Sequence, residues 1–125
     1  MYWGYHAMFD CSQGDRDLIT KRDVINDFVK ELVPAIDMVA YGEPMIVHFA
    51  QHDITKSGFS LCQMIETSSI TGHFVDASGD FYLDVFSCKT VDVAVCEQMI
   101  NKYFKPRKIR TNFITRSAEI GRVHV

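Results

Sequence analysis

The sequence predicts an α+β fold, a two-layer sandwich in which a largely antiparallel sheet carries two helices on one face. Six segments alternate apolar and polar residues or form short runs rich in β-branched residues, as strands do. Two longer segments repeat apolar residues at the three- and four-residue spacing of an amphipathic helix. The resulting order, β-α-β-β-β-β-α-β, favours hairpins with segregated helices over parallel βαβ units.

The first third of the chain contains one expected strand and one expected helix. Aromatic and apolar residues predict a strand over residues 5–10, ahead of a polar turn at 12–15. Thr20 is expected to be the N-cap of the first helix, and Pro34 is expected to end or kink it. The stripe that this helix would bury is made of Val24, Ile25, Phe28, Val29, Leu32 and Val33.

The remaining segments complete the sheet and the second helix. Strands are expected over residues 45–50, 58–65, 69–75, 80–88 and 108–116. Thr90 is expected to cap a helix that reaches Tyr103, with Asp92 near its positive end. Apolar residues occupy both faces of the middle strands, so we expect the second face to be covered, most economically by a second copy of the chain.

Length and composition exclude several classes of protein. The 125 residues fit a single domain, 1–125, and exclude two. Apolar residues make up 47% and charged residues 23%, which is typical of a folded globular protein and not of a disordered one. The net charge of -3 lacks the basic footprint of a nucleic-acid binder. No apolar run has the length of a membrane span and no signal peptide is recognisable, so we expect a cytoplasmic protein with neither membrane nor nucleic acid as partner.

Cysteines and histidines provide no strong metal signal. Cys11, Cys62, Cys88 and Cys96 form no CxxC pair, so they are expected to be free thiols. His48 and His52 stand four residues apart, but in a segment that reads as strand and turn, so no metal site is expected. The sequence also lacks GxGxxG, P-loop, HExxH and GxSxG motifs, so a bound organic cofactor has no obvious cradle.

Polar residues among the apolar strands are the remaining candidates for chemistry. Each alone has an ordinary structural explanation: Ser68 could shape a turn, His73 could be a half-buried ring, and Cys88 could fill the end of a strand. The full set is Ser60, Glu66, Thr67, Ser68, His73, Asp84 and Cys88.

Taken together, these residues resemble the core of the prokaryotic S-adenosylmethionine decarboxylases, which are pyruvoyl enzymes of polyamine synthesis. In that family a histidine follows the cofactor serine by five positions, and a cysteine follows fifteen positions later at the end of a strand. Ser68, His73 and Cys88 reproduce both intervals. Ser60, two residues after Gly58, matches a second family serine that takes part in processing. The resemblance extends over roughly residues 4–116, beginning with the family-like segment Gly4-Tyr5-His6-Ala7.

The resemblance implies a self-processing proenzyme. It would be cleaved between Thr67 and Ser68 into a β chain, 1–67, and an α chain, 68–125, that stay together in one domain. Ser68 would become the pyruvoyl group that forms a Schiff base with the substrate, His73 and Ser60 would promote processing, and Cys88 would return a proton to the product. The implied product is decarboxylated S-adenosylmethionine for spermidine synthesis, and the implied assembly is a homodimer of cleaved protomers.

The departures from the family pattern concern the substrate. The family's Ser-Glu before the cofactor serine is Glu66-Thr67 here, and the following His-Leu is Ser69-Ile70. The ribose-binding glutamate becomes Ala77, with Asp76 as a neighbouring substitute, and the adenine-stacking aromatic becomes Ile54, with Phe49 or Phe59 as substitutes.

Three functions therefore remain open on the sequence. The resemblance implies a substrate site that includes Ile54, Glu66, Ile70 and Asp76. Decarboxylation of S-adenosylmethionine is the first hypothesis. Decarboxylation of L-ornithine or L-arginine is the second, in which an acidic residue such as Glu66, Asp76, Asp80 or Asp84 would pair with the distal cation. An unprocessed small-molecule binding domain is the third.

Overall fold

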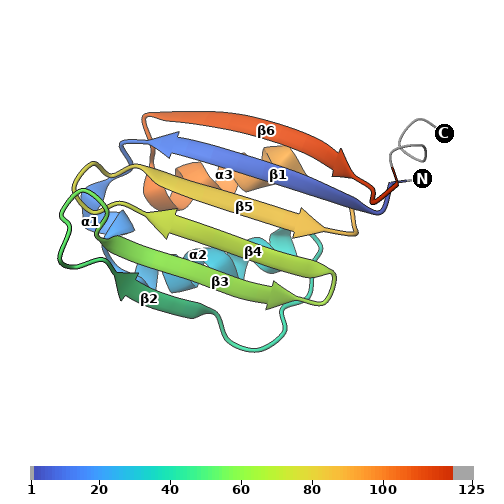
Figure 1. Cartoon of the computed structure of the whole chain (residues 1–125), viewed down its shortest axis with the longest axis horizontal. Helices are drawn as coiled ribbons and strands as arrows, with labels where there is room; N and C mark the ends of the chain where they lie inside the picture. The colour runs from blue at the N-terminus through green and yellow to red at the C-terminus, as the bar shows by residue number, and fades with distance from the viewer. Residues whose placement is uncertain (1, 120–125) are drawn as a thin grey trace.

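The computed structural model describes residues 2–119, so residues 1 and 120–125 of the expected domain lie outside the described residues. Its centre is a six-stranded sheet of spatial order β2-β3-β4-β5-β1-β6, with every neighbouring pair antiparallel (Figure 1). The predicted α+β class is confirmed. The strands are β1 (Gly4–Ser12), β2 (Met45–Phe49), β3 (Gly58–Ile65), β4 (Ser68–Phe74), β5 (Phe81–Ser87) and β6 (Lys108–Arg116).

The long helices α2 (Arg22–Ala35) and α3 (Val93–Phe104) lie side by side behind the sheet and cover one of its faces (Figure 1). A short helix, α1 (Arg16–Ile19), precedes them and was not predicted. None of the helices in the described part of the chain is long and apolar enough to cross a membrane.

Both predicted N-caps were wrong. Thr20 is the C-cap of α1, and the N-cap of α2 is Lys21, which makes no side-chain capping hydrogen bond. Asp15 caps α1 by accepting a hydrogen bond from the Asp17 amide. The second helix is capped by Asp92, whose carboxylate accepts from the Val95 amide at 3.2 Å, instead of by Thr90. Pro34 lies in the last turn of α2 and does not end the helix before it, since the helix extends one residue further.

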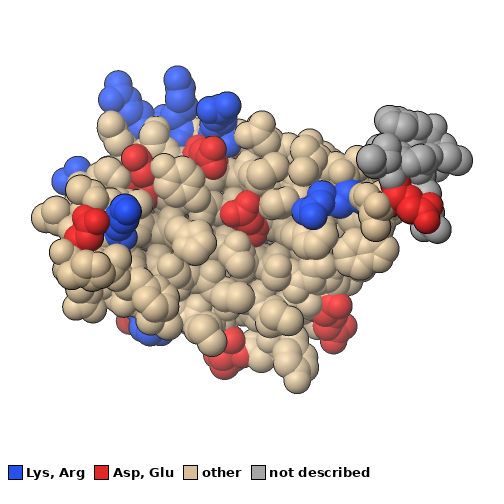
Figure 2. Space-filling view, viewed as in Figure 1, with Lys and Arg blue, Asp and Glu red and all other residues tan. Residues whose placement is uncertain are grey.

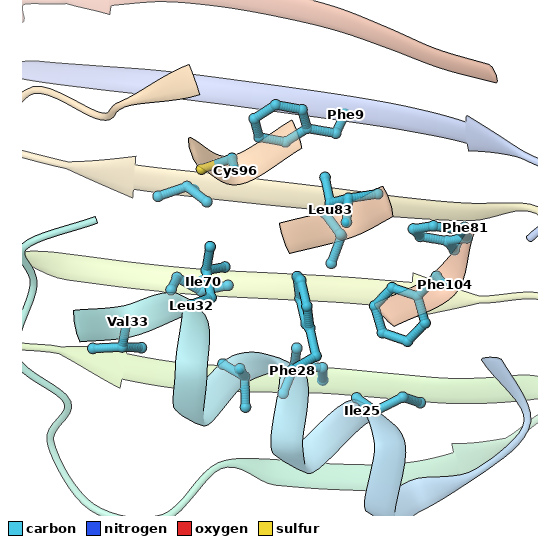
Figure 3. Packing of buried hydrophobic residues seen from close by; sticks show 14 of the residues in the cluster. Phe9, Ile25, Phe28, Leu32, Val33, Ile70, Phe81, Leu83, Cys96 and Phe104 are labelled. Atoms are coloured by element: carbon cyan, nitrogen blue, oxygen red, sulfur yellow. The ribbon is translucent and has the colours of Figure 1, made fainter. Parts of the chain in front are cut away.

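Strict alternation along the strands sends one set of side chains to the helices and the other set to the opposite, helix-free face. On β5, Phe81, Leu83 and Val85 are buried whereas Tyr82 is exposed. The buried set meets the apolar stripes of α2 and α3 in one core (Figure 3). We call the other side of the sheet the open face.

Aromatic rings dominate the centre of this core. Phe28 of α2 packs against Phe104 of α3, with ring centroids 4.8 Å apart, and Phe104 contacts Phe74 and Phe81 from the sheet (Figure 3). These rings come from four elements that are distant in sequence, so the core fixes the helices against β4 and β5.

Candidate active site

The Thr67–Ser68 peptide lies at the tight turn between β3 and β4, at one end of the sheet. Ser68 is the first residue of β4 and pairs with Ser87 of β5 and with Ile65 of β3. The Cys88 amide N–H donates a hydrogen bond of 3.0 Å to the Thr67 carbonyl oxygen. The carbonyl of the expected cleavage bond is therefore fixed by the residue that the sequence predicted as proton donor.

The segment after α2 supports this turn from its other side. The Glu66 amide donates to the Val39 carbonyl at 2.9 Å, and the Tyr41 amide donates to the Met64 carbonyl at 2.9 Å. Ala40 forms an isolated bridge with Ile65. Residues 39–41 thus extend the sheet locally beside the turn and restrict its movement.

Hydroxyl groups line the inner side of the turn. The Ser87 hydroxyl, wholly buried, lies 2.9 Å from Thr67 Oγ1, and Thr67 Oγ1 lies 3.3 Å from Met38 Sδ. The sequence analysis singled out Thr67 but missed Ser87 and Met38. The proximity of Ser87 depends on the pairing of β4 with β5, and that of Met38 depends on how the segment after α2 packs against the turn.

Ser60 and His73 form the second cluster predicted from the sequence. They are directly opposite each other on β3 and β4, and Ser60 Oγ lies 3.1 Å from His73 Nδ1. Gly58 allows the close approach of these strands, since a Cβ there would lie only 1.7 Å from the Phe74 carbonyl oxygen. Both side chains have the register of the open face.

The structure separates this Ser60–His73 pair from the Thr67–Ser68 peptide. His73 follows Ser68 by five residues on one continuous strand, and at about 3.3 Å per residue this places their Cα atoms about 16 Å apart. Ser68 has the register of the buried residues Ile70 and Gly72, which face the helices. Within one chain, therefore, His73 does not reach the bond whose processing it was expected to promote.

The four cysteines fall into two classes. Burial raises the pKa of the Cys11 and Cys96 thiols to about 12, so these residues are unreactive core groups. Cys62 and Cys88 are exposed. All four are free, as the sequence predicted, and only Cys88 lies next to the Thr67–Ser68 peptide.

The four residues predicted for substrate binding do not form one cluster in this structure. Ile54 is 77% exposed in the loop between β2 and β3, and Glu66 is exposed in the β3–β4 turn. Ile70 lies in the core with no exposed surface, so it offers nothing to a substrate in this structure. Asp76 accepts a hydrogen bond from His48 at 2.6 Å, and its second oxygen, Oδ1, is buried without a hydrogen-bond partner.

A second histidine–carboxylate pair lies on the open face. His6 Nε2 of β1 is 3.0 Å from Asp84 Oδ1 of β5, and the His6 ring packs edge-on against Phe86. Sequence analysis had noted both residues separately. It missed their contact because neither spacing nor periodicity shows that β1 pairs with β5.

A hollow of about 430 Å³ lies beside this pair, lined by Trp3, Phe86, Arg116, Ser117 and Ala118. The Trp3 and Phe86 rings are 5.8 Å apart, and the Arg116 guanidinium carbon lies 4.8 Å from the Phe86 centroid. Since Phe86 is two residues before Cys88, the hollow opens on the same end of the sheet as the Thr67–Ser68 peptide.

Most of the open face is uncharged, apart from an acidic side chain near its centre and a basic one to the right of it (Figure 2). Lysine and arginine side chains gather instead along one edge (Figure 2). Several large apolar side chains with the register of this face are 43–66% exposed: Met45, Phe49, Met64, Tyr82 and Ile114. An exposed apolar surface of this kind is typical of an interface.

No cluster of three or more histidine, cysteine, aspartate or glutamate side chains suited to a metal ion occurs among residues 2–119.

Comparison with known proteins agrees in sequence and in fold. The sequence profile of the family described as S-adenosylmethionine decarboxylase matches residues 5–117. The S-adenosylmethionine decarboxylase proenzyme of Clostridium botulinum strain Hall is 29% identical over 98% of this chain and 93% of the relative, and that of strain Loch Maree is 27% identical over the same shares. The crystal structure of the adenosylmethionine decarboxylase from Aquifex aeolicus VF5 has a TM-score of 0.77 and 18% identity, over 94% of this chain and 93% of that one.

Proposed function

Because the chain belongs to the S-adenosylmethionine decarboxylase family, we propose that it is a self-cleaving proenzyme that becomes a pyruvoyl-dependent decarboxylase of S-adenosylmethionine. The observation that carries this proposal is the hydrogen bond from the Cys88 amide to the Thr67 carbonyl, on the bond just before Ser68. An amide N–H at this position stabilises negative charge that develops on the carbonyl oxygen during attack.

Cleavage proceeds by an acyl shift from nitrogen to oxygen, a β-elimination and a hydrolysis. The Ser68 hydroxyl loses its proton and attacks the Thr67 carbonyl carbon; the Ser68 nitrogen leaves and takes up a proton, so the peptide bond becomes an ester. A base then removes the Ser68 α-proton, and the bond between Cβ and the ester oxygen breaks, which frees Thr67 as a carboxylate. The resulting enamine rearranges to an imine. Water adds to the imine carbon and ammonia leaves, so a pyruvoyl group remains at position 68.

The residues present fit such a group. Ser68 begins a strand, so the new terminus is held by the pairing of β4 with β3 and β5 and needs no separate binding pocket. The pyruvoyl ketone supplies an electron sink when carbon dioxide leaves the substrate. Cys88, exposed and directly after β5, is the proposed proton donor to the product carbon, since a thiol can serve as a general acid.

The position of His73 supports a dimer. His73 is too far from Ser68 of its own chain, so we propose that it acts on the partner subunit. A two-fold axis that crosses the middle of β4 between two face-to-face sheets would bring the Ser68 backbone of one copy, from which the α-proton is removed, opposite His73 of the other, while the Ser68 side chain keeps its inward register. The apolar open face supplies the surface for this contact, and packing two such faces would cover the exposed side chains described above.

The hollow near Cys88 supports a nucleoside substrate. Trp3 and Phe86 provide aromatic rings that could replace the stacking residue for which this chain has Ile54. Arg116 adds a positive charge. Aromatic and guanidinium groups stack on flat bases. We therefore place S-adenosylmethionine first and expect the protein to act in the cytoplasm, in spermidine synthesis.

Release of carbon dioxide tests this function. The purified wild-type protein is incubated separately with carboxyl-labelled S-adenosylmethionine, L-ornithine and L-arginine, with Ser68→Ala as the inactive control. We expect labelled carbon dioxide from S-adenosylmethionine alone. Release from ornithine or arginine, without release from S-adenosylmethionine, would show that the proposed substrate is wrong. If none of the three substrates released carbon dioxide, the proposed decarboxylase activity would be contradicted.

A further inference from the structure

We infer that Ser87 is a positioning residue for self-cleavage, and that it acts through the side chain of Thr67. The inference rests on the proposed function, because it assigns a role in cutting the Thr67–Ser68 bond. Its evidence is a chain of hydrogen bonds that joins β5, the β3–β4 turn and the end of α2.

The donor and the acceptor in each of these hydrogen bonds follow from what each atom can donate. A thioether sulfur only accepts hydrogen bonds, so the Thr67 hydroxyl is the donor in its 3.3 Å contact with Met38 Sδ. Thr67 Oγ1 must then be the acceptor for the Ser87 hydroxyl at 2.9 Å. Ser87 Oγ in turn accepts from the Lys89 amide at 3.0 Å. The Ser87 hydroxyl also lies 3.6 Å from the sulfur, but its contact with Thr67 is shorter.

Lys89 joins the two ends of this series of hydrogen bonds. The Lys89 ammonium donates to the Asp37 carbonyl at 2.5 Å and lies 3.2 Å from the Asp37 carboxylate. Asp37 precedes Met38, the last acceptor of the chain. The residue on the acyl side of the cleavage bond is therefore held in a closed ring that ties residues 37–38 to residues 87–89.

This ring fixes the carbonyl that must be attacked. Thr67 uses its hydroxyl both as donor and as acceptor, so rotation about χ1 would break two hydrogen bonds. Its carbonyl is bound at the same time by the Cys88 amide. With side chain and carbonyl both fixed, the carbonyl carbon stays oriented for the hydroxyl of the next residue, which is the positioning that intramolecular attack requires.

The burial of Ser87 supports this role for its hydroxyl. Ser87 continues the inward register of Phe81, Leu83 and Val85, and it has no exposed surface. A hydroxyl among apolar side chains is unfavourable unless it is hydrogen-bonded. An alanine would pack at this position without that cost, so the structure assigns the hydroxyl to Thr67.

The test is the rate of cleavage of freshly made proenzyme. Wild type, Ser87→Ala, Thr67→Val and the double variant are produced by pulse-labelled cell-free translation, and the appearance of two fragments is followed on denaturing gels. Loss of one link should slow cleavage about tenfold in each single variant. The double variant should be no slower than either single variant, because both substitutions break one chain. Ser87→Thr, which keeps the hydroxyl, should cleave faster than Ser87→Ala.

Ser78→Ala is the matched control. Ser78 accepts a hydrogen bond from the Asp80 amide at 3.1 Å in the turn at the other end of the β4–β5 pair. Its loss removes a side-chain hydrogen bond to the backbone far from Thr67, so cleavage should keep the wild-type rate even if Tm falls as much as in Ser87→Ala.

Each result decides the inference. It is overturned if Ser87→Ala and Thr67→Val cleave at the wild-type rate, or if Ser78→Ala slows cleavage as much as they do. Failure of the proposed function gives a different result, since wild type itself would then remain uncut.

Discussion

Co-expression of two inactive variants tests whether His73 acts across a dimer. Ser68→Ala cannot be cut but keeps His73, whereas His73→Ala keeps the bond but lacks the imidazole. Expressed alone, neither variant should be cut efficiently, because one lacks the serine and the other lacks the imidazole in both subunits. The separation of about 16 Å between Ser68 and His73 along β4 exceeds the reach of a histidine side chain, so the missing imidazole should be replaceable only from the partner. Loss of a general base slows a proton transfer by roughly a hundredfold or more.

Mixed dimers should restore the cut. In random assembly of equal amounts, about half of all His73→Ala chains have a Ser68→Ala partner that supplies His73. Denaturing mass spectrometry of the co-expressed, differently tagged chains should therefore show about half of the His73→Ala chains cleaved and every Ser68→Ala chain intact. The double variant Ser68→Ala/His73→Ala is the control partner, and it should restore nothing. If that control partner also restored cleavage, or if Ser68→Ala restored none, trans action of His73 would be refuted.

Three further predictions concern reactivity and stability. Iodoacetamide at pH 8 should label Cys88 in the native protein but neither Cys11 nor Cys96, whose pKa burial raises to about 12. Labelling of Cys11 and Cys96 at the rate of Cys88 would contradict the burial argument. Phe28→Ala should lower the free energy of unfolding by about 3–5 kcal/mol in urea titrations, because it leaves a cavity against Phe104. Hydrogen bonds from Lys102 and Tyr103 lower the pKa of Glu31 in the folded protein. The contribution of Glu31 to stability is therefore present above its unfolded pKa and is lost as the pH falls through the lower folded pKa. Glu31→Gln should lower Tm at pH 7 and leave it unchanged at pH 2, and an equal loss of Tm at both pH values would refute this.

The strands and the layer order could be predicted from sequence because both depend on short-range periodicity. Residues 108–116 and 58–65 form strands with the predicted bounds. The N-caps could not be predicted in the same way. Thr20 and Thr90 have suitable side chains, but Asp15 and Asp92 stand where the backbone first turns, and the short helix α1 shifts the start of α2.

The candidate site was predictable in its residues and not in its geometry. The intervals that join Ser68, His73 and Cys88 identify the family resemblance, but an interval of five residues along a strand means distance and not contact. The contact of Cys88 with Thr67 depends on the register of β4 with β5, which no local pattern specifies. The same holds for the pair of Ser87 with Thr67.

Self-cleavage is measured directly by the mass of the purified wild-type protein under denaturing conditions. Self-cleavage predicts two fragments that meet between Thr67 and Ser68, with the downstream fragment blocked by a pyruvoyl group and thus resistant to Edman degradation. Ser68→Ala should give one intact chain. A single intact wild-type chain would contradict self-cleavage if it also stayed intact in hydroxylamine, which cleaves esters.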